Sequence, residues 1–271
     1  MTDLDESEPE ILVPTRADPG MMVGVNDEDA GSPELEELGR AAVDTLRLAV
    51  APVSDGYGFE ILVYVNDEEM TSAGAGLGMD PDDLLVPVNR LQATTAPVTV
   101  PIARCECGEY GCGSTDVTIV RDGASVHWDW SLEVPMDRGV TFAAAQYDAE
   151  VARVGADRSW ETPERTAGRL VLTGVDRDRL TGRGLRIGSA ANYYLDETKF
   201  VVSLMFGTYQ VFVLTPWLDR TPEELAREVC ATLLRPPQEW VATWHDTRST
   251  GTPPEIAGPL WQPFERPGRN T

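Results

Sequence analysis

The chain has 271 residues, enough for one large domain or two modest ones, and its 42% apolar and 25% charged residues are ordinary for a globular protein. Its formal net charge of −23 argues against nucleic acid and anionic membranes as partners, because both would be repelled, and favours a basic protein. No apolar run approaches the roughly 20 residues of a membrane-spanning helix. The acidic start MTDLDESEPE also lacks the basic segment of a secretory signal. We therefore expect a cytoplasmic protein whose cysteines are kept reduced.

Residues 1–32 are predicted to form an acidic, largely disordered N-terminal tail. The segment is broken by prolines and carries too little apolar surface to offset the entropy of ordering it. A helix is expected to begin near Ser32, because Pro33 suits the first helical position. Apolar residues then recur at helical spacing, namely Leu35, Leu38, Ala42, Leu46 and Val50.

The next hundred residues are predicted to be rich in strands. The run Phe59 to Val65 is typical of a buried strand, since it consists mainly of β-branched and aromatic residues. Residues 71–78 (TSAGAGLG) lack the lysine of a phosphate-binding loop, so we expect a surface loop there, followed by a short helix from Asp80. Strands at residues 98–104, 114–121 and 124–131 should form an antiparallel meander, with Asp122-Gly123 as the turn between the last two.

The remainder alternates between helical and extended patterns. Thr221-Pro222-Glu223-Glu224 fits a capping box at the start of a helix. Other helices are expected at residues 142–154, 163–172 and 238–244, and strands at 185–194, 200–206 and 209–214. The predicted fold class is α+β, with two lobes that each contain an antiparallel three-strand meander packed by helices. The lobes are placed at residues 33–136 and 140–246, and residues 247–271 form a Pro-rich C-terminal tail.

One short stretch carries chemistry. Cys105, Cys107 and Cys112 lie within eight residues of sequence, and glycine directly follows two of them. Glycine permits the tight turns in which backbone N–H groups point at thiolate sulfur, and three thiolates are a common part of a tetrahedral zinc site. The C-x-C-x4-C spacing differs from the usual C-x2-C pairs, however. Three free thiols in a glycine-rich loop, or a reversible Cys105–Cys112 disulfide, therefore stay open beside zinc.

The fourth ligand of such a site is not evident from the sequence. If Asp122-Gly123 is the turn, Thr118 lies opposite His127, which places His127 about 13 Å from the cysteine loop at about 3.3 Å per residue. Glu133, Glu109, Glu106 or a residue from another segment would be better placed. The other candidates are weaker: Cys230 lies beside an apolar helical stripe, and His245-Asp246 has no accompanying nucleophile motif.

The cysteine run C-E-C-G-E-Y-G-C-G, followed by a strand and then V-H-W-D-W, resembles a segment of uncharacterised actinobacterial proteins. The later stretch Y-Q-V-F-V-L-T-P-W with its T-P-E-E helix is similar to the same group. The resemblance covers most of residues 40 to 245 loosely, and its one specific motif is the cysteine loop. It implies a bacterial cytoplasmic protein and no particular activity.

We therefore predict a non-enzymatic protein whose acidic surface binds a basic partner, with Cys105, Cys107 and Cys112 as ligands of a structural zinc. Its similarity to bacterial immunity proteins is one of composition: acidic, cytoplasmic and without catalytic motifs. The alternative is a metal- or thiol-dependent enzyme that uses residues 105–112. The two differ in that a structural zinc is closed by four protein ligands, whereas a catalytic zinc keeps a position for water.

Overall fold

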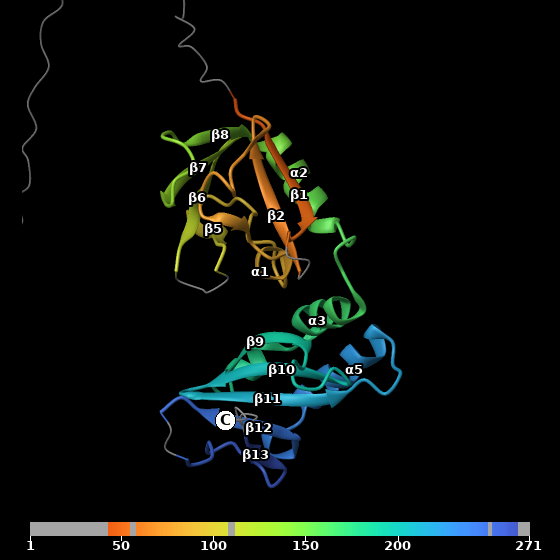
Figure 1. Ribbon diagram of the computed structural model, residues 1–271. Helices are drawn as coiled ribbons and strands as arrows, with labels where there is room; N and C mark the ends of the chain where they lie inside the picture. The colour runs from red at the N-terminus through yellow and green to blue at the C-terminus, as the bar shows by residue number, and fades with distance from the viewer. Residues whose placement is uncertain (1–42, 55–57, 108–111, 249–250, 265–271) are drawn as a thin grey trace, which may run out of the picture. The chain divides into compact units, whose positions relative to one another are not determined.

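The computed structural model describes residues 43–54, 58–107, 112–248 and 251–264 (Figure 1). The predicted acidic tail of residues 1–32, the predicted helix start at Ser32 and the final residues 265–271 lie outside these ranges. The chain is α+β, as predicted, with helices and three mainly antiparallel sheets. None of the helices in the described ranges combines the length and apolar character needed to cross a lipid bilayer.

The first sheet has the strand order β1-β2-β3, with β1 at Leu46–Pro52, β2 at Phe59–Val65 and β3 at Glu68–Glu69. The strand predicted at residues 59–65 is confirmed, whereas the helix predicted to continue to Val50 is wrong from Leu46 onward. Leu46 and Leu48 alternate into the core, and β1 pairs antiparallel with β2 so that Leu46 lies opposite Val65. The apolar residues of this segment therefore follow a period of two and not the helical period.

Side chains of helix α2 (Ala144–Ala156) occupy the free edge of β1, beside which α2 lies in Figure 1. The amide of Gln146 accepts from Leu46 N at 3.3 Å and donates to Leu46 O at 2.6 Å. Glu150 Oε1 accepts from Leu48 N at 2.6 Å, and the guanidinium of Arg153 donates to Leu48 O. The backbone groups of Leu46 and Leu48 at this edge are thus satisfied, which hinders pairing of this part of β1 with another chain.

The second sheet contains the predicted meander at its centre. Its order is β4-β5-β6-β7-β8, with bounds Gly76–Gly78, Val98–Cys105, Ser114–Asp122, Ser125–Leu132 and Val140–Ala143. Helix α1 (Pro81–Leu85) precedes β5. The turn differs by one residue from the prediction, because Asp122 pairs with Ser125 and the two-residue loop is Gly123-Ala124. Gly123 has φ +54°, a left-handed conformation that glycine adopts easily, and His127 consequently lies opposite Val120 instead of Thr118.

The first two sheets and α2 share one hydrophobic core. Trp128 is fully buried in it, with ring centroids 5.4 Å from Phe142 and 5.9 Å from Tyr147. Strand β8 and helix α2 contribute residues 140–154 to this core. A fifth strand of the second sheet and a helix therefore complete the first core beyond residues 136–140, where the sequence analysis placed the boundary between the lobes.

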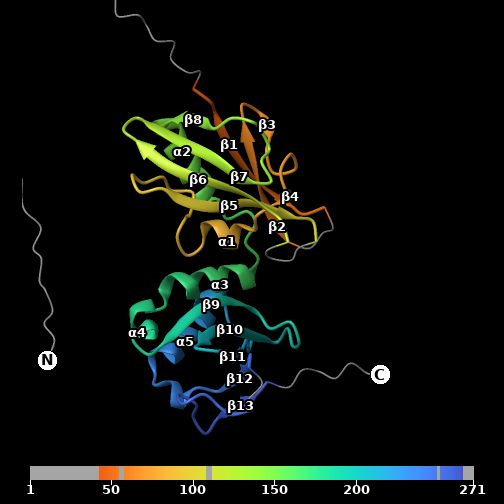
Figure 2. The ribbon, with the colours of Figure 1, turned by 90° about the vertical axis from the view of Figure 1, so that its left-hand side faces the viewer.

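The third sheet has the order β13-β12-β11-β10-β9 (Figure 2). The predicted meander is its antiparallel part β9-β10-β11, at Leu185–Asn192, Lys199–Phe206 and Tyr209–Pro216. Helices α3 (Pro163–Gly174), α4 (Arg177–Thr181) and α5 (Pro222–Leu234) belong to this half, and the capping box at Thr221 and Glu224 is confirmed. The helix predicted at residues 238–244 is wrong. A short 3-10 turn, η1 (Pro237–Glu239), leads there into β12 (Ala242–Asp246), and β13 follows at Trp261–Pro263.

In the part of the chain that the structure describes, helices pack on one face of the third sheet. Alternate side chains of β10 and β11, such as Val202 and Val213, are buried in a second core with residues of α3 and α5, such as Val171 and Val229. Trp240 is also fully buried there, stacked on Trp261 at 6.3 Å. The intervening residues of the strands point to the opposite face.

Candidate metal centre

The three cysteines singled out by the sequence come together at one end of the second sheet. Strand β5 ends at Cys105 and β6 begins at Ser114, so the cysteines lie at the connection between two paired strands. Their three Sγ atoms lie within 4.8 Å of one another. Cys105 is half-buried, whereas Cys107 and Cys112 are exposed. We call these residues the cysteine cluster.

Backbone hydrogen bonds hold the base of the cysteine cluster in place. Cys105 N donates to Gly113 O at 3.1 Å, and Glu133 N donates to Ser114 O at 3.1 Å. The hydroxyl of Thr115 donates to Glu133 O at 2.7 Å. The segment that follows β7 is thereby fixed beside the first residues of β6, close to the sulfurs.

The glycine-rich residues 71–78 also support the cluster, although the sequence predicted only a surface loop. Their last part forms β4, in which Gly76 pairs with Cys105. A Cβ atom at Gly74 would collide with the hydroxyl of Thr115, so the absence of a side chain allows this close approach. The glycines serve packing against the cysteine-bearing strands.

Two of the three sulfurs in the cysteine cluster lie especially close to each other. The Sγ atoms of Cys105 and Cys107 lie at disulfide bonding distance, with Cα atoms 5.4 Å apart, and Cys112 is a free thiol. The pair therefore differs from the Cys105–Cys112 disulfide that the sequence left open. A thiol held in a disulfide cannot ligate a metal, so metal binding requires this pair to be reduced.

No fourth ligand completes the cluster among the described residues, since no imidazole or carboxylate atom joins the three sulfurs within 4.8 Å. His127 is excluded by its position. It lies opposite Val120, roughly 20 Å along the sheet from Ser114 at about 3.3 Å per residue. Its Nδ1 shares a 2.9 Å hydrogen bond with the hydroxyl of Thr141. Glu109, another sequence candidate, lies outside the described ranges.

Glu133 is the acidic residue best placed to approach the sulfurs. A Cβ atom at Gly113 would collide with the Glu133 carboxylate and would lie 3.5 Å from Cβ of Cys105. The carboxylate and Cys105 therefore flank the same glycine. Glu106 instead extends over Gly76, where its Cγ lies 3.1 Å from the position of an added Cβ. The two glutamates that the sequence could not separate are thus distinguished by the fold.

The chemistry of the cluster fits a thiophilic divalent cation. Sulfurs bound at about 2.3 Å to one zinc ion lie roughly 3.8 Å apart in tetrahedral geometry. Three sulfurs already confined to 4.8 Å need only small side-chain rotations to reach that arrangement. The donor set is therefore suited to zinc once the cysteines are reduced.

We compared the whole chain with family models, curated proteins and solved structures. No match was found.

The other sites named from the sequence form no catalytic pair or reactive thiol among the described residues. Cys230 is half-buried on α5, and burial raises the pKa of its thiol, which disfavours the reactive thiolate. His245 and Asp246 are neighbours on β12, so their side chains point to opposite faces of the sheet and cannot form a catalytic pair. His245 instead borders a hollow on the outer face of the third sheet. The sequence analysis did not find this hollow because it predicted a helix, and not strand β12, at residues 238–244.

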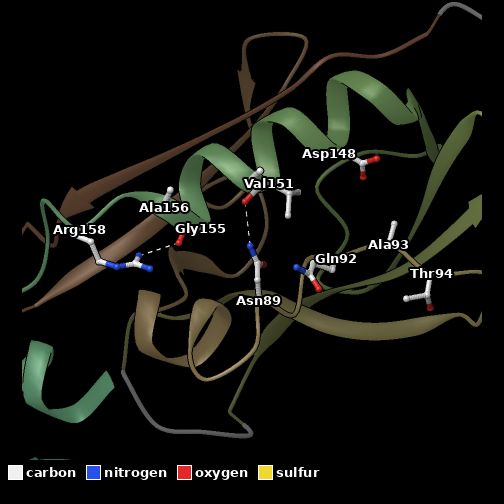
Figure 3. A pocket seen from close by; sticks show the side chains of 10 residues that line it. Asn89, Gln92, Ala93, Thr94, Asp148, Val151, Gly155, Ala156 and Arg158 are labelled. Carbon is white, nitrogen blue, oxygen red and sulfur yellow. Dashed lines mark hydrogen bonds between the residues drawn. The ribbon is translucent and has the colours of Figure 1, made fainter. Parts of the chain in front are cut away.

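A larger groove of about 640 Å³ runs between α2 and residues 89–94 (Figure 3). Asn89 Nδ2 donates to Val151 O at 3.1 Å, and Arg158 Nη1 donates to Gly155 O at 2.9 Å, as the dashed lines show. These polar groups join parts of the fold to one another. The groove is therefore explained by packing between a helix and a loop, and we assign it no ligand.

Proposed function

We propose that the protein is a non-enzymatic, cytoplasmic metal-binding protein in which Cys105, Cys107 and Cys112 hold one structural zinc ion. The proposal rests on the confinement of their three Sγ atoms within 4.8 Å at the end of a paired sheet. A closed zinc site would tie the β5–β6 connection to the segment after β7. A reducing compartment such as the cytoplasm would keep all three thiols available.

Glu133 is proposed as the fourth ligand. Its backbone is held by bonds to Ser114 and Thr115, so a change of side-chain rotamer alone would bring the carboxylate toward the sulfurs. Carboxylate oxygen ligates zinc at about 2.0–2.2 Å. Closure by Glu133 would give a site of four protein ligands, which is the arrangement of a structural centre.

Cobalt(II) substitution tests this ligand set, because cobalt replaces zinc in such sites and its absorption spectrum reports thiolate ligands and coordination number. Reduced full-length protein should bind one cobalt per chain with intense thiolate charge-transfer and tetrahedral bands. Glu133→Gln should alter the tetrahedral bands and weaken binding by about tenfold or more. Glu106→Gln is the matched control and should leave the spectrum unchanged.

A different spectrum would change the assignment. If Cys107→Ser retained the full charge-transfer band, the cluster would not be the metal site. If Glu106→Gln and Glu133→Gln behaved alike, Glu133 would not be the fourth ligand. These outcomes separate the site itself from its closure.

The catalytic alternative is supported by one observation, the lack of a fourth protein ligand within 4.8 Å of the sulfurs in the described ranges. A centre with three cysteines and an open position would bind water, which the metal would activate. Adding imidazole distinguishes the two. An open site should take imidazole and shift its cobalt bands, whereas a site closed by Glu133 should not respond.

The acidic surface supports a second part of the proposal, a basic protein partner. With a net charge of −23, exposed attraction to such a partner should be weakened by screening at high salt. A pull-down at low salt should recover a basic protein that high salt releases. Recovery of nucleic acid would contradict this part of the proposal without affecting the metal centre.

A further inference from the structure

The outer face of the third sheet, opposite α3 and α5, carries a hollow of about 470 Å³. Side chains from β9, β10, β11 and β12 line it, together with the residues that follow β9 and with Phe264 after β13. Its volume lies within the range of small-molecule sites. We call it the outer hollow.

The register of the sheet gathers four polar side chains in the outer hollow. Ser189 lies opposite Ser203 across β9 and β10. Gln210 lies opposite His245 across β11 and β12. Cross-strand partners of this kind are about 5 Å apart at their Cβ atoms, so each pair forms one compact polar position.

These four side chains make no hydrogen bond to any other residue in the described ranges. They differ in this respect from the polar groups of the groove beside α2, where Asn89 and Arg158 are bonded within the fold. Two hydroxyls, an amide and an imidazole together offer both donors and acceptors. The outer hollow thus presents unused hydrogen-bonding capacity on a rigid sheet.

Aromatic rings supply much of the remaining wall, together with Ala191, Asn192 and Val201. Phe212 rises from the centre of the sheet and packs on Phe264, with centroids 5.4 Å apart and planes inclined by 45°. Tyr193 and Tyr194 form a second, edge-to-face pair with centroids 5.5 Å apart, and Tyr194 is 74% exposed. Flat apolar walls of this kind favour a planar ring.

No aspartate, glutamate, lysine or arginine lines the outer hollow, although one residue in four of the chain is charged. A charged ligand would lose its hydration there without gaining an opposite charge. The lining therefore selects against ions. It is suited to a ligand that combines an aromatic surface with neutral donors and acceptors.

We propose that the outer hollow binds a neutral, planar heterocyclic molecule. Its ring lies against Phe212, and its polar edge hydrogen-bonds with Ser203, Gln210 and His245. This site is separate from the cysteine cluster, and its occupancy does not depend on the metal.

Ligand-observed NMR on the full-length protein tests the proposal with defined probes. Uracil, adenine and nicotinamide are the neutral planar probes, and benzoate and benzamidine are charged probes of comparable size. At least one neutral probe should bind saturably, and both charged probes should bind at least tenfold more weakly. Ser203→Phe fills the hollow beside Phe212 and should weaken binding of that probe by at least tenfold.

Two further variants make the test specific. Ser125 is a half-buried serine facing outward from the second sheet, so Ser125→Phe is the matched control and should leave probe affinity within twofold. Gln210→Leu keeps the side-chain size and removes the amide, and should weaken binding at least fivefold. Binding of no neutral probe, equal binding of charged probes, or unchanged binding by folded Ser203→Phe would each overturn the proposal.

Discussion

The two five-stranded sheets of this protein treat their outer faces differently. Both bury one face in a core, which holds Trp128 in the second sheet and Val202 in the third. On the outer face of the second sheet, two pairs of polar side chains bond to each other, His127 to Thr141 and Thr99 to Thr118, each at 2.9 Å. On the third sheet, Ser189, Ser203, Gln210 and His245 have no such partners among the described residues, whereas Asn192 in the same hollow accepts from Trp217 Nε1 at 2.7 Å.

The difference teaches that a polar outer face has two uses. Side chains that satisfy one another stabilise a sheet and leave little for a ligand. Side chains left unpaired beside aromatic rings contribute little to folding and remain available for binding. We therefore assign the outer face of the second sheet to stability and that of the third sheet to recognition.

The largest expected effect is a loss of core packing in the second sheet. Trp128→Ala should lower the free energy of unfolding by about 3–5 kcal/mol, because it opens a cavity and removes the bond from Trp128 Nε1 to the hydroxyl of Tyr147. Phe212→Ala, on the outer face of the third sheet, should cost only about 1 kcal/mol. Urea denaturation of both variants checks the prediction, and equal losses would contradict the placement of Phe212 outside the second core.

An intermediate loss of stability is expected on substitution of Asp44, which is 4% exposed. Asp44 precedes β1 and forms a β-bridge with Phe142 of β8. Arg138 donates to both of its carboxylate oxygens at 3.0 and 2.7 Å, and Thr141 N donates at 3.0 Å. The bond from Arg138 is the main cause that lowers the pKa of Asp44 from 3.8 to about 2. Asp44→Asn should lower stability by on the order of 1–2 kcal/mol. This range is smaller than the full pKa shift implies, because solvent screens the exposed guanidinium of Arg138.

The sign of the pH dependence follows from the lowered pKa. The carboxylate's contribution should be fully present above pH 4 and should disappear as the pH falls toward 2. The stability difference between wild type and Asp44→Asn should shrink over that window. Asp67→Asn is a control on an exposed residue and should change stability by less than about 0.5 kcal/mol. A difference between wild type and Asp44→Asn that is constant down to pH 2 would refute the assigned role.

The smallest changes in stability are expected for substitutions on the two outer faces, and they allow these faces to be compared directly. Thr141→Val removes the hydroxyl that is bonded to His127 and should cost about 0.5–1 kcal/mol. Ser203→Ala removes a hydroxyl without a partner and should be neutral within about 0.3 kcal/mol. Differential scanning calorimetry resolves such differences. A larger loss in Ser203→Ala would show that the outer hollow is already used in folding.

Elements marked by local signals were predictable from the sequence. The capping box at Thr221, the β-branched run at 59–65 and both meanders depend on residues that are close in the chain. Strands β1 and β12 were missed because their apolar residues are compatible with two periods. Leu46 and Val50, like Trp240 and Trp244, also match helical spacing, and only pairing with β2 and β11 selects the extended form.

The candidate sites divide in the same way. Cys105, Cys107 and Cys112 could be proposed from the sequence because their proximity there already confines the sulfurs. The choice of Glu133 over Glu106 required the contacts at Gly113 and Gly76, which no sequence pattern encodes. The outer hollow required the register of four strands. Its residues are spread from Ser189 to Phe264 and show no common motif.

The metal content of reduced full-length protein tests the central claim most directly. The cysteine cluster should copurify with about one zinc per chain, and its thiols should resist a thiol reagent until a chelator or denaturant is added. Cys107→Ser should lose the zinc, while His127→Ala should retain it because His127 lies at the far end of the sheet. Metal-free protein whose three loop thiols all react at once would contradict the proposed zinc centre.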